Sequence, residues 1–417
     1  MNKTIFIICA IACSVIIASS VVWATNPSDE TDKPDIAKDK ATVVKGNNKF
    51  AFDLYAKLRA QNGNLFCSPN SISTALAMTY AGARGETEKQ MAKVLHFGLK
   101  QERLHPAFAA LIKESAPGKP EYYQLSIANA LWGQKGYQFL PEFLDLTNKN
   151  YSAGIKELDF IRDTEKARQA INAWVEKETQ DKIKELIQKN ILNDLTTLVL
   201  TNAIYFKGTW LYQFDKNKTQ EADFTLADGK KIKAQMMSLP EPTEKSGRPE
   251  FAYRTEKDFQ LLKLPYNGKE LAMIILLPDK YDGLADCENM LTADNINNWC
   301  EEMHDEKVIV SLPRFKVTCN YELNKIMANM GMPLAFTRTA DFSGMESKKE
   351  LLISNIIHKA FVDVNEEGTE AAAATAVVMT RKNGKSHPVF YADHPFIFII
   401  RDERSGAILF MGRLMTP

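Results

Sequence analysis

This chain of 417 residues has no excess of positive or of negative charge. Its 52 lysine and arginine residues balance 52 aspartate and glutamate residues, so the formal net charge is zero. No basic stripe stands out either, whereas proteins that bind nucleic acid or heparin-like polyanions concentrate positive charge on one face. We therefore expect no nucleic-acid partner and no heparin site. With 45% hydrophobic residues, the chain has ample material for a large core.

Cysteine is also scarce. Two of the six cysteines, Cys9 and Cys13, lie in an apolar run at the N-terminus. The other four are widely spaced, which argues against a CxxC site and against a disulfide framework. We expect these four to be buried free thiols, although the sequence leaves a chance pair open: Cys67, Cys287, Cys300 and Cys319.

Motifs of enzymes and metal sites are missing as well. No pair of the six histidines has metal-site spacing, and neither GxSxG nor HExxH occurs. Gly384-Lys385-Ser386 resembles the end of a phosphate-binding loop, but Met379 stands where that motif needs its first glycine. A Cys67–His358 dyad is formally possible, and Cys67 is better interpreted as buried structure. We expect no enzymatic activity, no metal and no cofactor.

The N-terminus has the pattern of an export signal. Met1-Asn2-Lys3 precedes an apolar run that ends with Val22-Trp23-Ala24. A short basic start, an apolar stretch and a small residue at the cleavage position are typical of a secretory signal peptide. We expect this peptide to span 1–24, and the protein to be exported, either secreted or at the cell surface.

Two other interpretations of this N-terminus stay open. The apolar run is nearly long enough to span a bilayer, so it could be a retained membrane anchor. Acylation of Cys13 would instead make a lipoprotein. Residues 25–46 are polar and charged, and we expect them to form a disordered tether.

Apolar periodicity predicts helices mainly in the first half of the chain and strands mainly in the second. Helical spacing occurs in 47–60, 73–81, 85–95, 104–113 and 164–186, and strand patterns occur in 125–132, 198–206, 261–265 and 272–277. The continuous apolar run 198–206 is typical of a buried central strand. No linker composition divides the chain, so we expect a single α+β domain over 47–417, built around a large sheet.

The most informative segment lies near the C-terminus. Gly368 opens a run of small residues that contains no proline, and the basic pair Arg381-Lys382 follows before Pro388. Such a run can leave a loop and join a sheet, because no bulky side chain blocks entry and every residue can donate a backbone hydrogen bond. An alanine-rich surface helix is the alternative. The strand patterns on both sides, at 361–365 and 389–391, favour the sheet.

Several separated motifs, together with this segment, resemble the serpin family, whose members inhibit serine proteases. The motifs occur in the family's order over roughly 47–417, at 64–73, 81–87, 201–210, 340–345, 357–360, 392–398 and 410–413. The resemblance implies three β-sheets, about eight or nine helices and an exposed reactive-centre loop at about 366–388. It also implies a metastable monomer that inhibits a protease by inserting its cleaved loop into its own central sheet.

The resemblance assigns roles to individual residues. The hinge of the loop would comprise Glu366, Gly368, Thr369, Glu370, Ala371, Ala372, Ala373, Ala374 and Thr375. A polar "shutter" beneath the opening strands would comprise Ser68, Ser71, Asn202 and His358. A "breach", where insertion begins, would comprise Trp210, Arg314 and Glu366. For Arg314 and Glu366, the alternative is two solvated charges that contribute little.

Strand alternation then divides the loop into two faces. The inward positions would be small or apolar, from Thr369 to Met379, and the nearby charge of Glu370 would point outward. Burying one unpaired charge would stall insertion, because it costs several kcal/mol. This hinge has neither a proline nor an inward charge, which favours an inhibitor over the alternative of a non-inhibitory serpin-fold carrier or chaperone.

The basic pair suggests the target. Counting along the loop from Glu366, as in family members with a standard hinge, places the reactive bond between Lys382 and Asn383. Arg381 is the alternative, because the downstream segment looks longer than is common. Either cation suits a trypsin-like protease. Cleavage upstream, within 377–380, would suit elastase-like or subtilisin-like proteases, and the pair could also be solvated loop charges.

Overall fold

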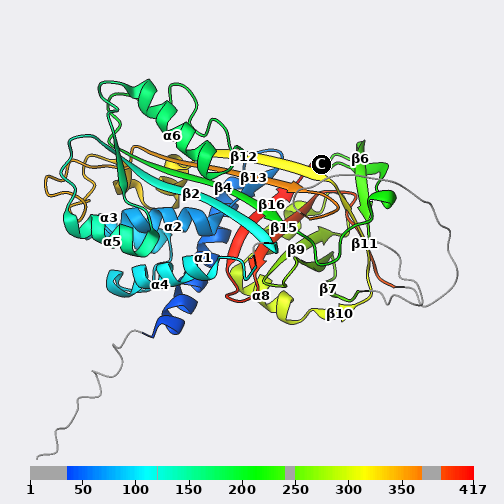
Figure 1. Cartoon of the computed structure of the whole chain (residues 1–417). Helices are drawn as coiled ribbons and strands as arrows, with labels where there is room; N and C mark the ends of the chain where they lie inside the picture. The colour runs from blue at the N-terminus through cyan, green and yellow to red at the C-terminus, as the bar shows by residue number, and fades with distance from the viewer. Residues whose placement is uncertain (1–34, 120, 240–248, 369–386) are drawn as a thin grey trace, which may run out of the picture. The chain divides into compact units, whose positions relative to one another are not determined.

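The computed structural model describes residues 35–119, 121–239, 249–368 and 387–417 (Figure 1). Residues Ile36–Pro417 cluster as one unit. Its described part contains nine α-helices: α1 (Ile36–Leu58), α2 (Pro69–Tyr80), α3 (Gly85–Val94), α4 (Gln101–Glu114), α5 (Pro141–Tyr151), α6 (Thr164–Glu178), α7 (Leu284–Met290), α8 (Ala293–Glu301) and α9 (Asn324–Met330).

The strands form three sheets. The five-stranded sheet has the order β12 (Phe315–Glu322), β13 (Asn355–Val364), β4 (Leu198–Gly208), β2 (Tyr123–Gln134) and β3 (Ile155–Leu158). The seven-stranded sheet has the order β1 (Leu65–Cys67), β16 (Ile408–Leu414), β15 (Phe396–Asp402), β9 (Leu271–Pro278), β8 (Phe259–Pro265), β7 (Phe251–Thr255) and β10 (His304–Glu306). The four-stranded sheet has the order β14 (Val389–Tyr391), β11 (Ile309–Pro313), β6 (Lys231–Ser238) and β5 (Gln220–Thr225). The predicted α+β class with three sheets is confirmed.

The five-stranded sheet positions the site. Its centre is β4, in which every residue except Lys207 is buried, as the apolar run predicted. On one side β4 pairs antiparallel with β2, and on the other it pairs parallel with β13. The parallel pairing joins Asn355–Phe361 to Val199–Tyr205 and stops there, although both strands continue. The two strands therefore share a ladder over most of their length and part beyond it.

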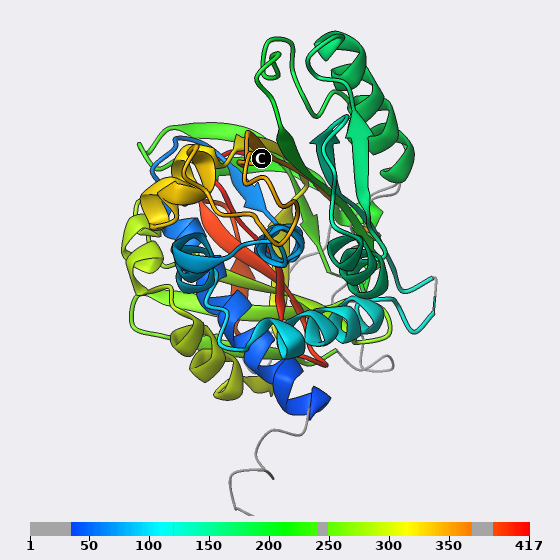
Figure 2. The ribbon, with the colours of Figure 1, turned by 90° about the vertical axis from the view of Figure 1, so that its left-hand side faces the viewer.

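Two helices cover this sheet in different ways. Helix α2 contacts β2, β4 and β16, and eleven of its twelve residues are buried, so it lies inside the molecule. It begins at Pro69, directly after the capping residue Ser68, whose hydroxyl accepts a hydrogen bond from the Ser71 N–H. Helix α6 lies across β2 on the other side (Figure 2), where Ile171 and Val175 pack on Ala128, Ala130 and Ala203.

The N-terminal boundary differs from the sequence prediction. We expected a disordered tether over 25–46, but α1 already begins at Ile36. The buried carboxylate of Asp39 accepts a hydrogen bond from Arg103 Nε of α4 at 3.1 Å, and Val43 joins the core. The polar composition of residues 25–46 gave no sign of these tertiary contacts. The predicted signal peptide and the first part of the tether lie outside the described residues.

A second difference concerns the helix predicted over 164–186. Helix α6 ends at Glu178, and Gln180, Asp181 and Glu185 then have positive φ angles. Ile183, Leu186 and Ile187 are still buried. Two hydrogen bonds hold the segment: Ile187 N–H donates to Asn172 Oδ1 at 2.8 Å, and Asn172 Nδ2 donates to the Ile187 carbonyl at 2.9 Å. The apolar spacing therefore predicted correctly that Ile183 and Leu186 are buried. It was wrong in predicting that the helix continues to residue 186.

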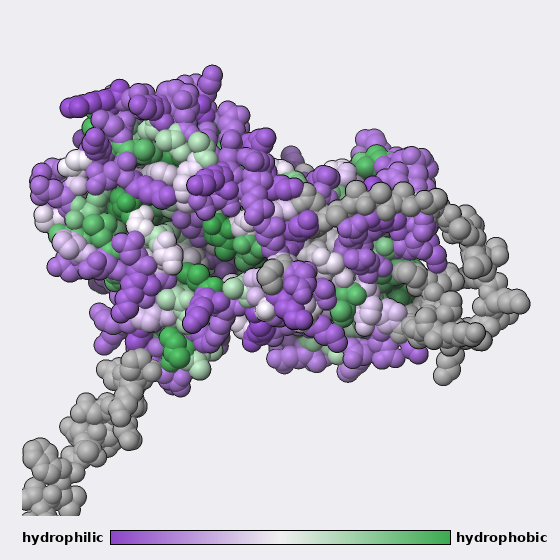
Figure 3. Space-filling view, in the orientation of Figure 1, coloured by the Kyte–Doolittle hydropathy of each residue, from purple (hydrophilic) through white to green (hydrophobic). Residues whose placement is uncertain are grey.

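The surface is mainly hydrophilic on the face shown in Figure 3, with hydrophobic side chains in separate clusters. Within the residues that the structure describes, no helix combines the length and the apolar character needed to cross a membrane.

Candidate functional site: the β4–β13 strand pair

A buried cluster of polar side chains ties β4 and β13 to α2. Asn202 of β4 lies opposite His358 of β13, and the Asn202 amide oxygen hydrogen-bonds His358 Nδ1. On its other edge, His358 Nε2 accepts a hydrogen bond from the Ser68 N–H at 3.2 Å. This fixes the tautomer: Nδ1 carries the proton and donates it to Asn202.

The cluster continues from Asn202 toward β2. The Asn202 amide nitrogen donates to Ser71 Oγ at 2.5 Å and also to Asn129 Oδ1 of β2. Ser71 Oγ in turn donates to Asn129 Oδ1 at 3.2 Å, and Ser68 Oγ donates to the Leu409 carbonyl at 2.7 Å. We call the five side chains the shutter cluster: Ser68, Ser71, Asn129, Asn202 and His358. The structure brings together all four residues named from the sequence.

Asn129 was missed in the sequence, although a signal was there. It interrupts the apolar pattern of a predicted strand between Ala128 and Ala130, and asparagine is depleted in strands. A polar residue at such a position needs a buried partner. The identity of that partner depended on tertiary contacts that the sequence does not display.

Burial sets the ionisation of His358. The ring is fully buried, and this burial lowers the pKa of His358 to about 3. The imidazole is therefore neutral near pH 7, as its role as both donor and acceptor requires. A second buried histidine, His105 of α4, bonds the Tyr151 hydroxyl through Nδ1 at 2.6 Å, and burial lowers its pKa to about 4.

Beyond the ladder, the chain after β13 crosses the end of β4. The Trp210 N–H donates to the Glu367 carbonyl and the Phe214 N–H donates to the Glu366 carbonyl, both at 2.9 Å. The Trp210 indole Nε1 donates to the Asn365 carbonyl at 3.0 Å, and its ring stacks on Tyr266 at 4.5 Å between centroids. Trp210 is thus buried between the end of β4 and the segment 365–368.

Glu366 is the buried charge of this region. Its side chain is 2% exposed and accepts hydrogen bonds from Arg314 Nη2 and Thr219 Oγ1, both at 2.5 Å, while Arg314 is 44% exposed. Burial raises the pKa of Glu366, the bonds from Thr219 and Arg314 lower it, and the net result is a lowered pKa. The pairing of Arg314 with Glu366 is therefore not one between two solvated charges. We call Trp210, Thr219, Arg314 and Glu366 the breach junction.

Gly368 is needed where the chain crosses β4. It forms a bridge with Thr209 at a φ of +151°, and a Cβ atom at this position would lie 1.9 Å from the Gly208 carbonyl oxygen. Any side chain would therefore push the segment away from β4. The rest of the predicted hinge, Thr369 to Thr375, and the predicted reactive residues Arg381, Lys382 and Asn383 lie outside the described residues.

The remaining candidate groups do not assemble a second site. Cys67, Cys287, Cys300 and Cys319 are free thiols. Cys67 and Cys287 are buried as predicted, whereas Cys300 and Cys319 are partly exposed, and burial raises the pKa of Cys67. Both ring nitrogens of His358 are engaged by Ser68 and Asn202, so His358 has none left for Cys67. Among the described residues, no group of three or more histidine, cysteine, aspartate or glutamate side chains could hold a metal ion.

The fold and site define a class: an α+β protein whose central parallel strand pair is closed over a buried polar cluster and whose next segment, 365–368, crosses the end of one of these strands. The model of the family described as "Serpin (serine protease inhibitor)" matches residues 45–417. The chain belongs to the serpin family. Its apolar N-terminal run lies outside the matched region.

Individual relatives agree with this assignment. The leukocyte elastase inhibitor of Sus scrofa is 44% identical to this chain over 381 residues, covering 89% of this chain and 98% of the relative. The crystal structure of Serpin48 from Tenebrio molitor is 33% identical, with a TM-score of 0.78 over 90% of this chain and 98% of that one. Human thyroxine-binding globulin in complex with thyroxine is 28% identical, with a TM-score of 0.81 over 91% of this chain and 99% of that one.

Proposed function

We propose that the protein is an irreversible suicide-substrate inhibitor of serine proteases, with trypsin-like enzymes as its first targets. The observation that carries the proposal is the end of the β4–β13 ladder. There the strands part, and the segment Asn365–Gly368 crosses the end of β4. The predicted reactive-centre loop follows it in the sequence. A strand that entered between β4 and β13 would continue directly from this segment.

In the proposed trap, the hydrolysis of a peptide bond by the protease stops at the ester intermediate. The protease serine attacks the carbonyl carbon of Lys382, the bond to the Asn383 nitrogen breaks, and an ester joins the protease to the loop. The freed loop then inserts between β4 and β13 before water cleaves the ester. Roughly a dozen new backbone hydrogen bonds at about 1 kcal/mol net would supply on the order of ten kcal/mol.

The choice of target rests on the loop sequence. Lys382, with Arg381 as the alternative, suits the acidic specificity pocket of a trypsin-like protease. The relative named leukocyte elastase inhibitor favours a second candidate, an elastase-like protease that cleaves among Val377, Val378, Met379 and Thr380. A cut there, or by a subtilisin-like protease, would leave a shorter strand to insert and a tighter tether. We propose that the protein acts as a monomer.

Incubation with trypsin and with pancreatic elastase tests the proposal. An SDS-resistant complex should form, and mass spectrometry of the released C-terminal peptide should identify the cleaved bond. Thr369→Arg, at a position that would face inward in the inserted strand, should convert the inhibitor into a substrate. Glu370→Arg is the matched control, because position 370 would face outward in the inserted strand and the trap should keep working. Clean cleavage of the unmodified protein by both proteases, with no complex, would contradict the proposal.

A carrier or chaperone is the alternative function, since thyroxine-binding globulin shares the fold and holds thyroxine. We propose further that the protein is exported through the predicted signal peptide 1–24, and that retention as a membrane anchor and acylation of Cys13 are the competing outcomes. Determination of the mature N-terminus distinguishes them: export with cleavage predicts that the chain starts at Thr25.

A further inference from the structure

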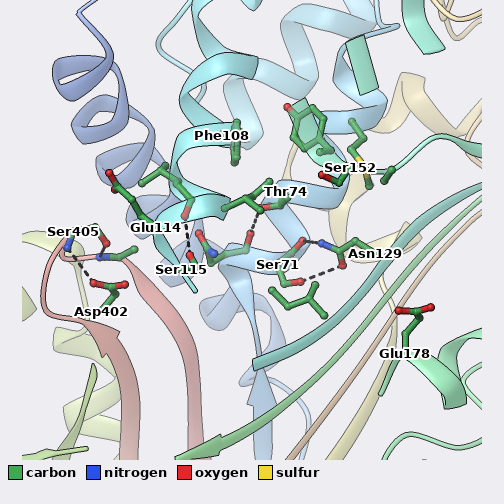
Figure 4. Close-up of a pocket in the computed structure, with 18 of the residues that line it drawn as sticks. Ser71, Thr74, Phe108, Glu114, Ser115, Asn129, Ser152, Glu178, Asp402 and Ser405 are labelled. Atoms are coloured by element: carbon green, nitrogen blue, oxygen red, sulfur yellow. Dashed lines mark hydrogen bonds between the residues drawn. The ribbon is translucent and has the colours of Figure 1, made fainter. Parts of the chain in front are cut away.

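A cavity of about 300 Å³ lies beside the shutter cluster and is not used by the proposed trap (Figure 4). Its volume is at the lower end of the range of small-molecule sites. Its walls come from α2, α4, β2 and the ends of α5 and α6. Phe108, Ile112, Ile127 and Trp174 supply apolar surface, and Ile112 and Ile127 are each more than a third exposed.

The charges at this cavity have one sign. Three carboxylates line it and no lysine, arginine or histidine does: Glu114 and Asp402 lie on one side, and Glu178 lies on the other (Figure 4). Glu114 is paired with Lys40 and Asp402 with Arg404, whose cationic groups lie outside the lining. Glu178 is exposed and interacts electrostatically with Lys156, which lies outside the lining.

Helix ends add to this negative field. Helices α4, α5 and α6 all finish at the cavity, where Ser115, Ser152 and Glu178 belong to the lining. The C-terminus of a helix carries a partial negative charge and favours a cation. The N-terminus of α2 also lies here, but the Ser71 N–H is already capped by Ser68 Oγ. The ammonium group of Lys156 lies 4.2 Å from the ring centre of Trp174, which belongs to the lining.

We propose that this cavity binds a small amphipathic amine. The apolar body would pack between Phe108, Ile127 and Trp174, and the ammonium group would lie toward Glu178 and the helix ends. The hydroxyl of Ser71 and the amide of Asn129 both line the cavity and both belong to the shutter cluster. A ligand here would therefore touch the network that joins β2 to β4 and, through Asn202, to β13.

Three probes that differ only in their head group test the assignment: 3-phenylpropylamine, 3-phenylpropanol and 3-phenylpropanoate, each titrated into the full-length protein by ligand-observed NMR. The amine should bind with an affinity of about millimolar or tighter and should bind most strongly of the three. Binding of the carboxylate as strong as that of the amine, or no binding of any probe, would overturn the proposal. Equal binding of the alcohol would overturn the assignment to an amine.

Two pairs of variants locate the site. Ile127→Trp should fill the cavity and abolish binding of the amine, whereas Ile161→Trp, at an exposed position outside the lining, should not. Glu178→Gln should weaken the binding of 3-phenylpropylamine by about two- to five-fold and leave the affinity for 3-phenylpropanol unchanged. Asp145→Asn, at an exposed carboxylate outside the lining, is its control. Binding that survives Ile127→Trp would contradict the site.

The link to the strand pair rests on the proposed function and is measured separately. Loop insertion would part Asn202 from His358, so the affinity for the amine should differ at least about three-fold between the intact and the loop-cleaved protein. Equal affinities would overturn the link alone, because the probe and variant measurements need no protease. If the cleaved protein gains no thermal stability, it is the proposed function that fails.

Discussion

The shutter cluster and the breach junction hold the same strand pair in different ways. The shutter cluster consists of neutral side chains that are buried except for the partly exposed Asn129. Its bonds run between β2, β4, β13 and the start of α2. The breach junction holds the segment after β13 by backbone hydrogen bonds and by one carboxylate, whose partner Arg314 is 44% exposed. Water and salt reach Arg314 of the breach junction, whereas Asn202 and His358 at the centre of the shutter cluster are buried. We infer that the strands part first at the breach junction.

Acid should expose the largest difference between the two regions. Burial keeps His358 of the shutter cluster neutral, with a pKa of about 3. It also keeps His105 of α4 neutral, with a pKa of about 4, although His105 belongs to neither region. The unfolded chain binds a proton near pH 6.5, so it holds more protons than the native protein between these values. Native stability should therefore be intact above about pH 6.5 and fall as the pH drops, by about 2 kcal/mol for each histidine at pH 5.

The pH dependence of thermal unfolding measures this effect. In His358→Gln the melting temperature should be lower at pH 7 but should fall less steeply between pH 6.5 and 5. His304→Gln, at an exposed histidine, is the control and should keep the steep profile. An unchanged slope in His358→Gln would show that this ring does not titrate as its burial implies.

Removing the centre of the shutter cluster should have the next largest effect. Asn202→Ala leaves His358 Nδ1, Ser71 and Asn129 without their shared partner in a buried site. We expect a loss of about 3 kcal/mol, since each unsatisfied buried group costs about 1–3 kcal/mol. Urea unfolding measures it, with Asn298→Ala on the surface of α8 as the control. A loss no larger than the control's would mean that the cluster does not hold the strands together.

A smaller effect is expected at the breach junction. Arg314→Gln leaves the Glu366 carboxylate buried with the Thr219 hydroxyl as its remaining side-chain partner. Because Arg314 is half exposed, water can compensate in part, and we expect a loss of about 1 kcal/mol. The same urea measurement at low and high salt checks it, and Lys233→Gln, in an exposed pair with Asp223, is the control. A loss equal to that of Asn202→Ala would remove the contrast between the regions.

The sequence predicted the fold well where local patterns carry the information. The apolar run of β4 and the strand patterns of β8 and β9 predicted both the strands and the buried positions on them. The alternation at 361–365 predicted the strand β13, but Asp363 on it is buried as well. The start of α1 and the end of α6 were wrong, because Asp39–Arg103 and the bonds of Asn172 with Ile187 depend on contacts between distant segments. The three sheets and the positions of Ser68, His358 and Glu366 came from the family resemblance, since no spacing rule brings these residues together.

Other parts of the account remain predictions. Residues Thr369–Thr375, the basic pair and the signal peptide lie outside the described residues, so their roles rest on the sequence. The family resemblance also missed one residue of the site. Asn129 belongs to the shutter cluster, but the resemblance did not name it.

The central claim is that the β4–β13 pair opens to accept the loop, and the thermal stability of the loop-cleaved protein tests it most directly. A protease that cuts within 376–386 should yield a two-chain product that remains associated. If the loop inserts, the product should melt about ten degrees or more above the intact protein, as stabilisation on the order of ten kcal/mol requires. A product that melts at the same temperature as the intact protein, or lower, would contradict the account.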